Sequence, residues 1–256
     1  MLTAEMILSR AENPEVRVGV GSRKGSAKVE RSVEMANKRG YGTSTVYQDP
    51  EGMIMDLLEG RINAAVRGDL GSNEVMSVIR RDFGVDRVMR AAAMEPREGA
   101  LFFLAPVGID EGWSLEDKEE IVHLGNQMLE SMGVEPHFAI MSGGRTSDIG
   151  RNEYVDRTIR EAEELVRWGC ERGMEIEHTE ILVEKAASVA NFVLAPDGVS
   201  GNIIFRTLHF LGSARALGAP VINLDRIFVD TSRAKESYLD SIGLASFMAH
   251  RMQQNI

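Results

Sequence analysis

The chain has 256 residues, of which 43% are hydrophobic and 27% charged, and these values exclude a disordered or fibrous protein. At about 150 residues per domain, this length predicts one large domain or two lobes. The net charge of −10 argues against a general nucleic-acid binder, which would need a basic footprint. The single cysteine, Cys170, excludes an intrachain disulfide and argues against a zinc finger, and we expect its thiol to be buried.

Residues 1–20 lack the basic start and apolar stretch of a signal peptide, and no apolar run approaches the roughly 18 residues of a membrane span. We therefore expect a cytoplasmic protein with no membrane partner and no nucleic-acid partner. The histidines are dispersed and show no metal-ligand spacing, so we expect no bound metal.

The first part of the chain alternates short β-branched runs with amphipathic stretches, which predicts parallel strands joined by crossover helices. Strands are expected at 16–20, 43–47 and 62–66, and helices at 27–38 and 50–58. Val29, Val33 and Ala36 share one face of the first of these helices, and Gly40 is placed to end it.

The rest of the chain repeats this pattern. Strands are expected at 100–106, 138–141, 190–195 and 220–223, and helices at 115–132, 153–172, 203–217 and 240–253. Ser114 and Asp117 have the spacing of a capping box at a helix start. The predicted fold class is therefore α/β, with mainly parallel sheets and helices on both faces.

In parallel sheets, ligands bind beyond the carboxyl ends of the strands, where helix N-termini offer N–H groups. Four loops rich in small and polar residues follow predicted strands, at 19–26, 67–73, 142–151 and 196–202. The first, GVGSRKGS, fits three interpretations: a dinucleotide site in which Asp49 contacts a ribose, a phosphate held by Arg23 and Lys24, or a tight turn with solvated cations. In the second, Ser72 is either a helix cap or part of a ligand loop.

The third loop combines glycines, hydroxyls and arginines in more abundance than a turn requires. Arginine side chains beside backbone N–H groups suit a phosphate or carboxylate. We favour a ligand loop, with Ser142, Arg145 and Thr146 as contacts, over a mobile surface loop. In the fourth loop, a hydroxyl, a glycine and an amide at a helix start predict an anion site, with contacts from Asp197, Ser200, Gly201 and Asn202; Ser200 also suits a helix cap.

This fourth loop carries a resemblance to known families. The run DGVSGNIIFRTL from Asp197 is similar to the motif of the phosphate acyltransferase PlsX, and PDxxSGN is similar to phosphate acetyl- and butyryltransferases. Further on, DTSR at 230–233 falls where phosphotransacetylases carry Asp-Leu-Ser-Arg. Within that superfamily, the short length and the RVGVGSRKG start resemble the methanogenesis marker protein 4 (MtxX) family.

The resemblance implies the two-lobed fold of isocitrate and isopropylmalate dehydrogenases, which phosphotransacetylases share. Residues 1–100 plus 221–256 are then expected to form lobe one and residues 101–220 lobe two, with the active-site cleft between them. It also implies a homodimer and a small anionic substrate, namely phosphate, acyl phosphate or acyl-CoA. No permanently bound cofactor is expected, because coenzyme A and phosphate would be substrates.

The resemblance assigns catalytic roles to the last third of the chain. Ser232 and Arg233 match the family motif, in which the arginine holds phosphate and the developing oxyanion. The family's base is a carboxylate that aligns here with Leu239, and Asp240 follows one position later. One position on a helix is a rotation of about 100°, so either an insertion precedes Asp240 or the base is lost. Glu236 and Asp230 are alternative carboxylates.

Among the upstream arginines, we expect Arg67 to line the cleft, with Arg87 and Arg90 as alternatives. The resemblance implies a transferase that moves an acyl group between phosphate and a thiol such as coenzyme A. The alternative is an accessory X subunit of a methyltransferase complex in methanogenesis, with methyltransferase subunits as partners and little or no acyltransferase activity. A nicotinamide-dependent dehydrogenase shares the fold class, but the chain lacks its set of metal-binding aspartates.

Overall fold

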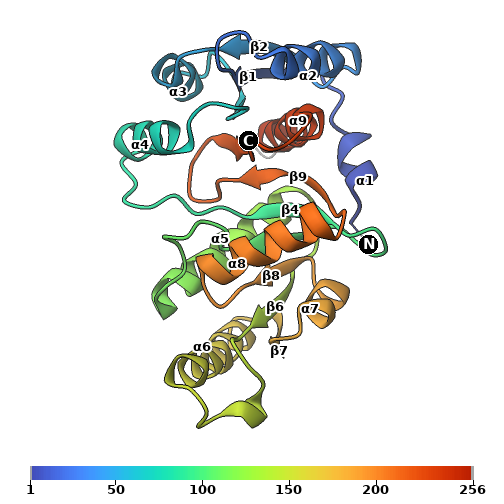
Figure 1. Cartoon of the computed structure of the whole chain (residues 1–256). Coiled ribbons are helices and arrows are strands. Elements are labelled where there is room, and N and C mark those ends of the chain that lie inside the picture. The colour runs from blue at the N-terminus through green and yellow to red at the C-terminus, as the bar shows by residue number, and fades with distance from the viewer. Residues whose placement is uncertain (1, 255–256) are drawn as a thin grey trace. The chain divides into compact units, whose positions relative to one another are not determined.

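A computed structural model describes residues 2–254 and divides the chain into two compact units (Figure 1). Unit 1 comprises Leu2 and Met89–Ala216, and unit 2 comprises Thr3–Val88 and residues 217–254. Residues 1, 255 and 256, the ends of the predicted lobe one, lie outside the described residues. Among the described residues, no helix is both long enough and apolar enough to span a membrane.

Unit 2 contains a mostly parallel sheet with strand order β2-β1-β3-β10-β9. Its strands are β1 (Arg17–Gly21), β2 (Thr43–Tyr47), β3 (Ala64–Val66), β10 (Ile227–Asp230) and the part of β9 (Arg215–Pro220) from Leu217 onward. β1 pairs in parallel with β2 and β3, β10 pairs in parallel with β3, and β9 runs antiparallel to β10. The predicted alternation of strands and helices is confirmed here.

The helices of unit 2 are α1 (Ala4–Leu8), α2 (Ala27–Lys38), α3 (Pro50–Leu58), α4 (Ser72–Phe83) and α9 (Leu239–Gln254). In α2 the predicted stripe of Val29, Val33 and Ala36 is buried, and Gly40 follows the helix with a left-handed φ of 72°. Helices α3 and α4 pack on the sheet through a core that includes Met53, Ile79 and Phe228. Burial of these apolar faces fixes which edge of the sheet carries the polar loops.

Unit 1 has a second sheet, of order β4-β5-β8-β6-β7. Its strands are β4 (Ala92–Glu95), β5 (Phe102–Ala105), β6 (His137–Met141), β7 (Glu175–Glu180) and β8 (Phe192–Leu194). β4 is antiparallel to β5, and the other pairs are parallel. All residues of β5 are buried, as expected for a strand covered on both faces.

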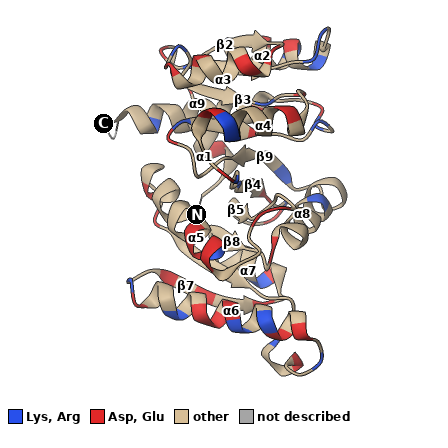
Figure 2. Cartoon of the chain, turned by 90° about the vertical axis from the view of Figure 1, so that its left-hand side faces the viewer, with Lys and Arg blue, Asp and Glu red and all other residues tan. Residues whose placement is uncertain are grey.

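The helices of unit 1 are α5 (Leu115–Ser131), α6 (Glu153–Cys170), α7 (Val183–Val189) and α8 (Gly198–Arg206). A short 3₁₀ turn (Thr146–Asp148) precedes α6, and a π-helical turn (Thr207–Leu211) follows α8. Both signs of charge are spread along α5 and α6 (Figure 2). The predicted capping box at the start of α5 is confirmed, with the Ser114 hydroxyl accepting from the Asp117 N–H and the Asp117 carboxylate accepting from the Ser114 N–H.

The predicted helix at 203–217 exists but its bounds are wrong, and the predicted strand at 220–223 is wrong because β9 ends at Pro220. Helix α8 begins earlier, at Gly198, and the helical segment ends at Leu211. Ser213 then adopts a left-handed φ of 58°, which a helix cannot accommodate, and the chain enters β9 at Arg215. Hydropathy in this stretch keeps a helical period, so it gave no sign of the break.

Two predicted helix caps and the predicted burial of the cysteine are also wrong. Gly71 rather than Ser72 is the N-cap of α4, and Asp197 rather than Ser200 is the N-cap of α8. Cys170 is exposed because it lies at the last residue of α6, just beyond the buried Gly169.

Replacing the capping hydroxyl of α5 should lower stability without altering the fold. We expect Ser114→Ala to reduce the free energy of unfolding by about 1 kcal/mol, because the Asp117 N–H loses its acceptor. Urea denaturation followed by circular dichroism measures the change. The matched control is Ser188→Ala in α7, whose exposed hydroxyl caps no helix start and which should change stability by less than about 0.5 kcal/mol. Equal losses in the two variants would contradict the capping role.

Candidate functional site

The two glycine-rich loops of unit 2 pack backbone against backbone. A Cβ on Gly68, whose φ is 59°, would lie 1.8 Å from the carbonyl oxygen of Gly21. Asp69, only 9% exposed, accepts from the Arg23 N–H at 2.7 Å and from the Ser26 hydroxyl at 2.6 Å. The loop after β1 and the loop after β3 therefore form one structure, and close packing accounts for Gly21 and Gly68.

Asp49 follows β2 and serves as the N-cap of α3. Its carboxylate accepts from the N–H groups of Glu51 and Gly52, at 3.2 and 2.9 Å. The carboxylate that the dinucleotide interpretation assigned to a ribose is thus engaged in starting a helix.

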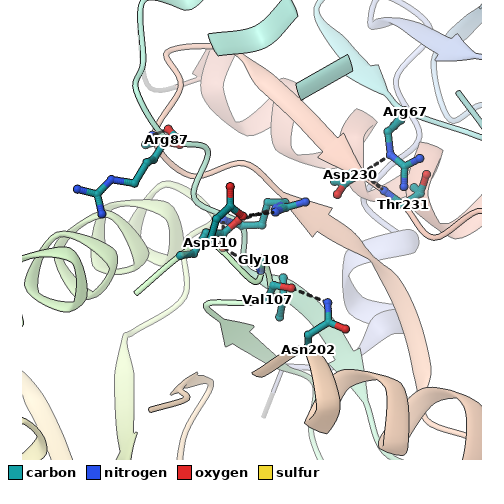
Figure 3. A network of polar contacts seen from close by, with 11 residues as sticks. Arg67, Arg87, Val107, Gly108, Asp110, Asn202, Asp230 and Thr231 are labelled. Carbon is teal, nitrogen blue, oxygen red and sulfur yellow. Dashed lines mark hydrogen bonds and ion pairs between the residues drawn. The ribbon is translucent and has the colours of Figure 1, made fainter. Parts of the chain in front are cut away.

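Arg67 is buried in an ion pair with Asp230 at the end of β10 (Figure 3). Its guanidinium also donates to the Leu70 carbonyl at 2.7 Å. The same Asp230 carboxylate accepts from the Thr231 N–H at 2.8 Å, and the Thr231 hydroxyl donates to the Gly68 carbonyl at 2.7 Å. These contacts show Arg67 joining the loop after β3 to the start of the segment that carries Ser232 and Arg233.

The Ser232–Arg233 segment is a turn held by α2. The Ser232 hydroxyl accepts from the Ala234 N–H at 3.2 Å. From α2, the Lys28 ammonium donates to the carbonyl oxygens of Arg233 and Lys235, both at 2.9 Å, and lies 5.0 Å from the centre of the Tyr238 ring. Lys28 thus holds the backbone of the turn, in which Arg233 is exposed and Ser232 is half-buried.

Several cationic groups act on Tyr238, which is fully buried beneath this turn. Burial raises the pKa of Tyr238 to about 12, and Asp69 adds to the rise, whereas Arg67, Arg23 and Arg233 oppose it. Arg23 and Arg233 therefore lie within electrostatic range of one phenol, together with the Lys28 ammonium. We name Arg23, Lys28 and Arg233 the basic cluster.

The two positions considered for the base lie at the start of α9. Leu239 is its first residue and is buried, with 8% exposure, while Asp240 is half-buried. Arg87, an alternative arginine, is exposed, and its carbonyl accepts from the Asn223 side chain at 2.8 Å.

In unit 1, Asp197 is the centre of a compact network. It is 3% exposed and accepts from the Ser200 N–H at 2.8 Å, from the Ser200 hydroxyl at 3.1 Å and from the Tyr154 hydroxyl. Burial, followed by the hydrogen bond to Asp197, raises the pKa of Tyr154 to about 12. The N-terminus of α8 is thus capped by the Asp197 carboxylate. Ser200 lies in the first turn of the helix and is half-buried.

The glycines of this loop permit close approach to residues 106–108. A Cβ on Gly198 would lie 1.6 Å from the Gly108 carbonyl oxygen, and one on Gly201 would lie 1.9 Å from that of Pro106. Asn202 donates its side-chain amide to the Val107 carbonyl at 2.8 Å (Figure 3). Asn202 is half-buried, and its amide oxygen turns away from this contact (Figure 3).

A second buried carboxylate, Glu111, holds residues 106–113 in place. It is 2% exposed and accepts from the Gly108 N–H at 3.1 Å and from the Arg90 Nε at 2.7 Å. Burial raises the pKa of Glu111, and Arg90 opposes the rise. The Glu111 carbonyl accepts from the Gly198 N–H at 3.0 Å, so the segment that Glu111 holds also contacts the first residue of α8.

The third predicted loop buries Ser142 but leaves Arg145 and Thr146 exposed. Ser142 is 1% exposed, donates to the Gly144 carbonyl at 2.8 Å and lies 2.8 Å from Nε2 of His178. Thr146 donates its N–H and hydroxyl to Glu180 at 2.9 and 3.0 Å. Arg145 is exposed. A cavity of about 310 Å³ adjoins this loop, and Ser142, Arg145 and Thr146 are not among its lining residues, which include Gly143, Gly144, Asp148, Arg151 and Asn152.

The structure thus brings Asp197 and Ser200 together in unit 1, and Ser232 and Arg233 together in unit 2. Tyr154, Lys28 and Glu111 were not predicted as site residues, because each lies on a helix or loop with no recognisable motif. Among the described residues, no group of three or more His, Cys, Asp or Glu side chains is placed to hold a metal ion.

Removing the partner of Glu111 should destabilise the protein in a pH-dependent way. Arg90→Met leaves a buried carboxylate unpaired, and we expect the free energy of unfolding to fall by about 3 kcal/mol at pH 8. Folding already raises the pKa of Glu111 above its ordinary 4.5, and loss of Arg90 raises it further. The folded state then binds the proton more tightly than the unfolded state, so the loss should shrink as the pH falls toward 5.

Chemical denaturation at the two pH values measures this difference. The double variant Arg90→Met/Glu111→Gln carries no charge at this site, so its stability loss relative to the wild type should change less between pH 8 and pH 5 than that of Arg90→Met. A loss of stability in Arg90→Met that is equal at pH 5 and pH 8 would contradict the role assigned to Glu111.

Solved structures show which fold this is. A phosphotransacetylase from Staphylococcus aureus matches with a TM-score of 0.73 and 14% identity, covering 97% of this chain and 100% of that one. A branched-chain phosphotransacylase from Enterococcus faecalis matches with a TM-score of 0.72 and 14% identity, covering 92% and 99%. The chain therefore has the α/β fold of phosphotransacetylases, as predicted.

Other proteins are more similar to this chain in sequence than these solved structures are. A protein of Methanosarcina mazei, provisionally named methyltransferase mtx subunit X, is 38% identical over 265 aligned positions, which cover 96% of this chain and 95% of that protein. No family model matches the chain. The identity and the near-complete coverage show that the chain belongs to the methyltransferase mtx subunit X (MtxX) family, whose structural relatives are phosphotransacetylases.

Proposed function

We propose that this protein binds a small phosphate-bearing anion and transfers an acyl group between phosphate and a thiol such as coenzyme A. The observation that carries the proposal is the basic cluster. In a chain of net charge −10, Arg23 and Arg233 both lie within electrostatic range of Tyr238, and Lys28 fixes the backbone of the Ser232–Arg233 turn. A guanidinium beside a hydroxyl is well suited to hold phosphate oxygens.

In the proposed reaction, the thiol sulfur attacks the carbonyl carbon of an acyl phosphate. The tetrahedral intermediate collapses with cleavage of the bond from carbon to the phosphate oxygen, giving a thioester and inorganic phosphate. Arg233 stabilises the departing phosphate, and Asp240 in the first turn of α9 accepts the thiol proton. In unit 1, the Ser200 hydroxyl and the Asn202 amide are proposed to contact a ligand oxygen. The predicted contacts of Ser142, Arg145 and Thr146 with a phosphate or carboxylate ligand stay predictions.

The alternative is an accessory subunit of a methyltransferase complex with little or no acyltransferase activity. The name of the Methanosarcina mazei relative favours it, and so does the burial of Leu239 at the position aligned with the family's base. The fold of the phosphotransacetylases favours the transferase. A homodimer and a cytoplasmic location stay predictions.

A coupled assay separates the two functions. The full chain is incubated with inorganic phosphate and a series of short-chain acyl-CoA thioesters, and free thiol and acyl phosphate are measured together. We expect turnover in the wild type and a fall of about 10- to 100-fold in kcat/KM for Arg233→Ala, since a charge-assisted contact to phosphate is lost. The control Arg226→Ala, in the same unit and ion-paired with Asp225, should match the wild type. No product with any thioester, together with no phosphate binding, would overturn the proposal.

The holding role of Lys28 gives a second prediction. Lys28→Met should weaken the binding of inorganic phosphate by about 10-fold, because the carbonyls of Arg233 and Lys235 lose their donor and the turn is released. Isothermal titration calorimetry measures the Kd. Lys38→Met removes the same charge from the same helix at an exposed pair with Glu34, and its Kd should stay within about 2-fold of the wild type. Equal weakening in both variants would show an effect of net charge alone.

A further inference from the structure

The hydrogen bonds at Asp197 are unevenly shared between its two oxygens. Oδ1 accepts from the Ser200 N–H, whereas Oδ2 accepts from both the Ser200 hydroxyl and the Tyr154 hydroxyl. Asp197 is 3% exposed, so water cannot readily replace a missing donor. Oδ2 therefore has two hydroxyl donors, and it keeps one of them if the other turns away.

The Ser200 hydroxyl has a single hydrogen, and that hydrogen is directed at Asp197. In this arrangement Ser200 can offer only lone pairs to its surroundings. A phosphate or carbonyl oxygen needs a donor, so Ser200 can bind such an oxygen only after its hydroxyl has turned away from Asp197. That rotation removes one donor from a buried carboxylate.

Tyr154 is placed to keep the carboxylate satisfied during this rotation. Its hydroxyl donates to Oδ2, and a tyrosine hydroxyl is protonated at neutral pH, so it remains a donor when Ser200 turns away. Tyr154 is 37% exposed, and the structure places Arg157 and Gly143 beside its ring. The Arg157 guanidinium lies 5.4 Å from its centre, and a Cβ on Gly143 would lie 3.2 Å from its edge.

We propose that Tyr154 is a positioning residue whose hydroxyl holds Asp197 so that Ser200 can turn its own proton toward an oxygen of a bound phosphate or acyl phosphate. The proposal rests on the proposed function for the identity of the ligand. Tyr154 contacts Asp197 and lies within hydrogen-bonding range of Ser200, and in this proposal it acts on the ligand through Ser200. It joins the third and fourth predicted loops, since it follows the former at the start of α6 and contacts the latter.

A double-mutant cycle with inorganic phosphate as the probe tests this. Tyr154→Phe should weaken phosphate binding by about 10-fold, because rotation of Ser200 then leaves Oδ2 without a donor. In the Ser200→Ala background, Tyr154→Phe should change the Kd by less than about 2-fold, since no hydroxyl remains to be released. Tyr47→Phe is the matched control. It removes a tyrosine hydroxyl that donates to Asp56 at 2.6 Å in unit 2, and its Kd should equal that of the wild type. Additive effects of Tyr154→Phe and Ser200→Ala would overturn the proposal.

A measurement without ligand separates this inference from the proposed function. Three-bond couplings in nuclear magnetic resonance report the side-chain rotamers of Ser200. Tyr154→Phe should raise the population of the rotamer directed at Asp197, because that carboxylate then depends on Ser200 alone. Should the wild type bind no phosphate, the proposed function fails, and the rotamer measurement still decides the role of Tyr154. An unchanged or smaller population of that rotamer would overturn it.

Discussion

A carboxylate removed from water must be surrounded by hydrogen-bond donors, and the polar loops of this protein are built around such groups. Asp69 gathers the loop after β1, Asp230 holds the loop after β3, and Asp197 starts α8. Because some of these donors come from segments distant in sequence, the buried charge determines where the loops meet. The acidic excess of the chain is therefore partly internal, and the exposed guanidinium groups of the basic cluster can lie beside it.

The pattern of apolar residues was sufficient to predict the bounds of a helix or strand wherever one face of that element is buried. The bounds of α2 and α3 match the predicted ranges, and the Ser114 capping box lies where the spacing placed it. Prediction failed where the backbone conformation of one residue decides the outcome. The left-handed Ser213 follows the end of a helical run whose apolar period continues, and the stop signal there is Gly212, which caps the helical turn and which hydropathy does not register.

Motif matching found Asp197, Ser200, Ser232 and Arg233 but not the groups that hold them. Tyr154 lies 43 residues before Asp197, and Lys28 lies 205 residues before Arg233. Each is an ordinary residue on an amphipathic helix, so only the tertiary fold gives it a role. For Arg67, by contrast, the family resemblance suggested a contact with the ligand, whereas the structure places its guanidinium in a buried ion pair with Asp230. Residue type alone did not distinguish an arginine facing a ligand from one that supports a loop.

The approach of Gly68 to the Gly21 carbonyl has a mechanical consequence for unit 2. With no side chain or water between the two backbones, neither loop can slide past the other. A pull on the Arg23 backbone passes through Asp69 to Gly68, and from the Gly68 carbonyl to the Thr231 hydroxyl. These contacts connect the glycine-rich loop after β1, the loop after β3 and Thr231, the neighbour of Ser232, into one continuous set.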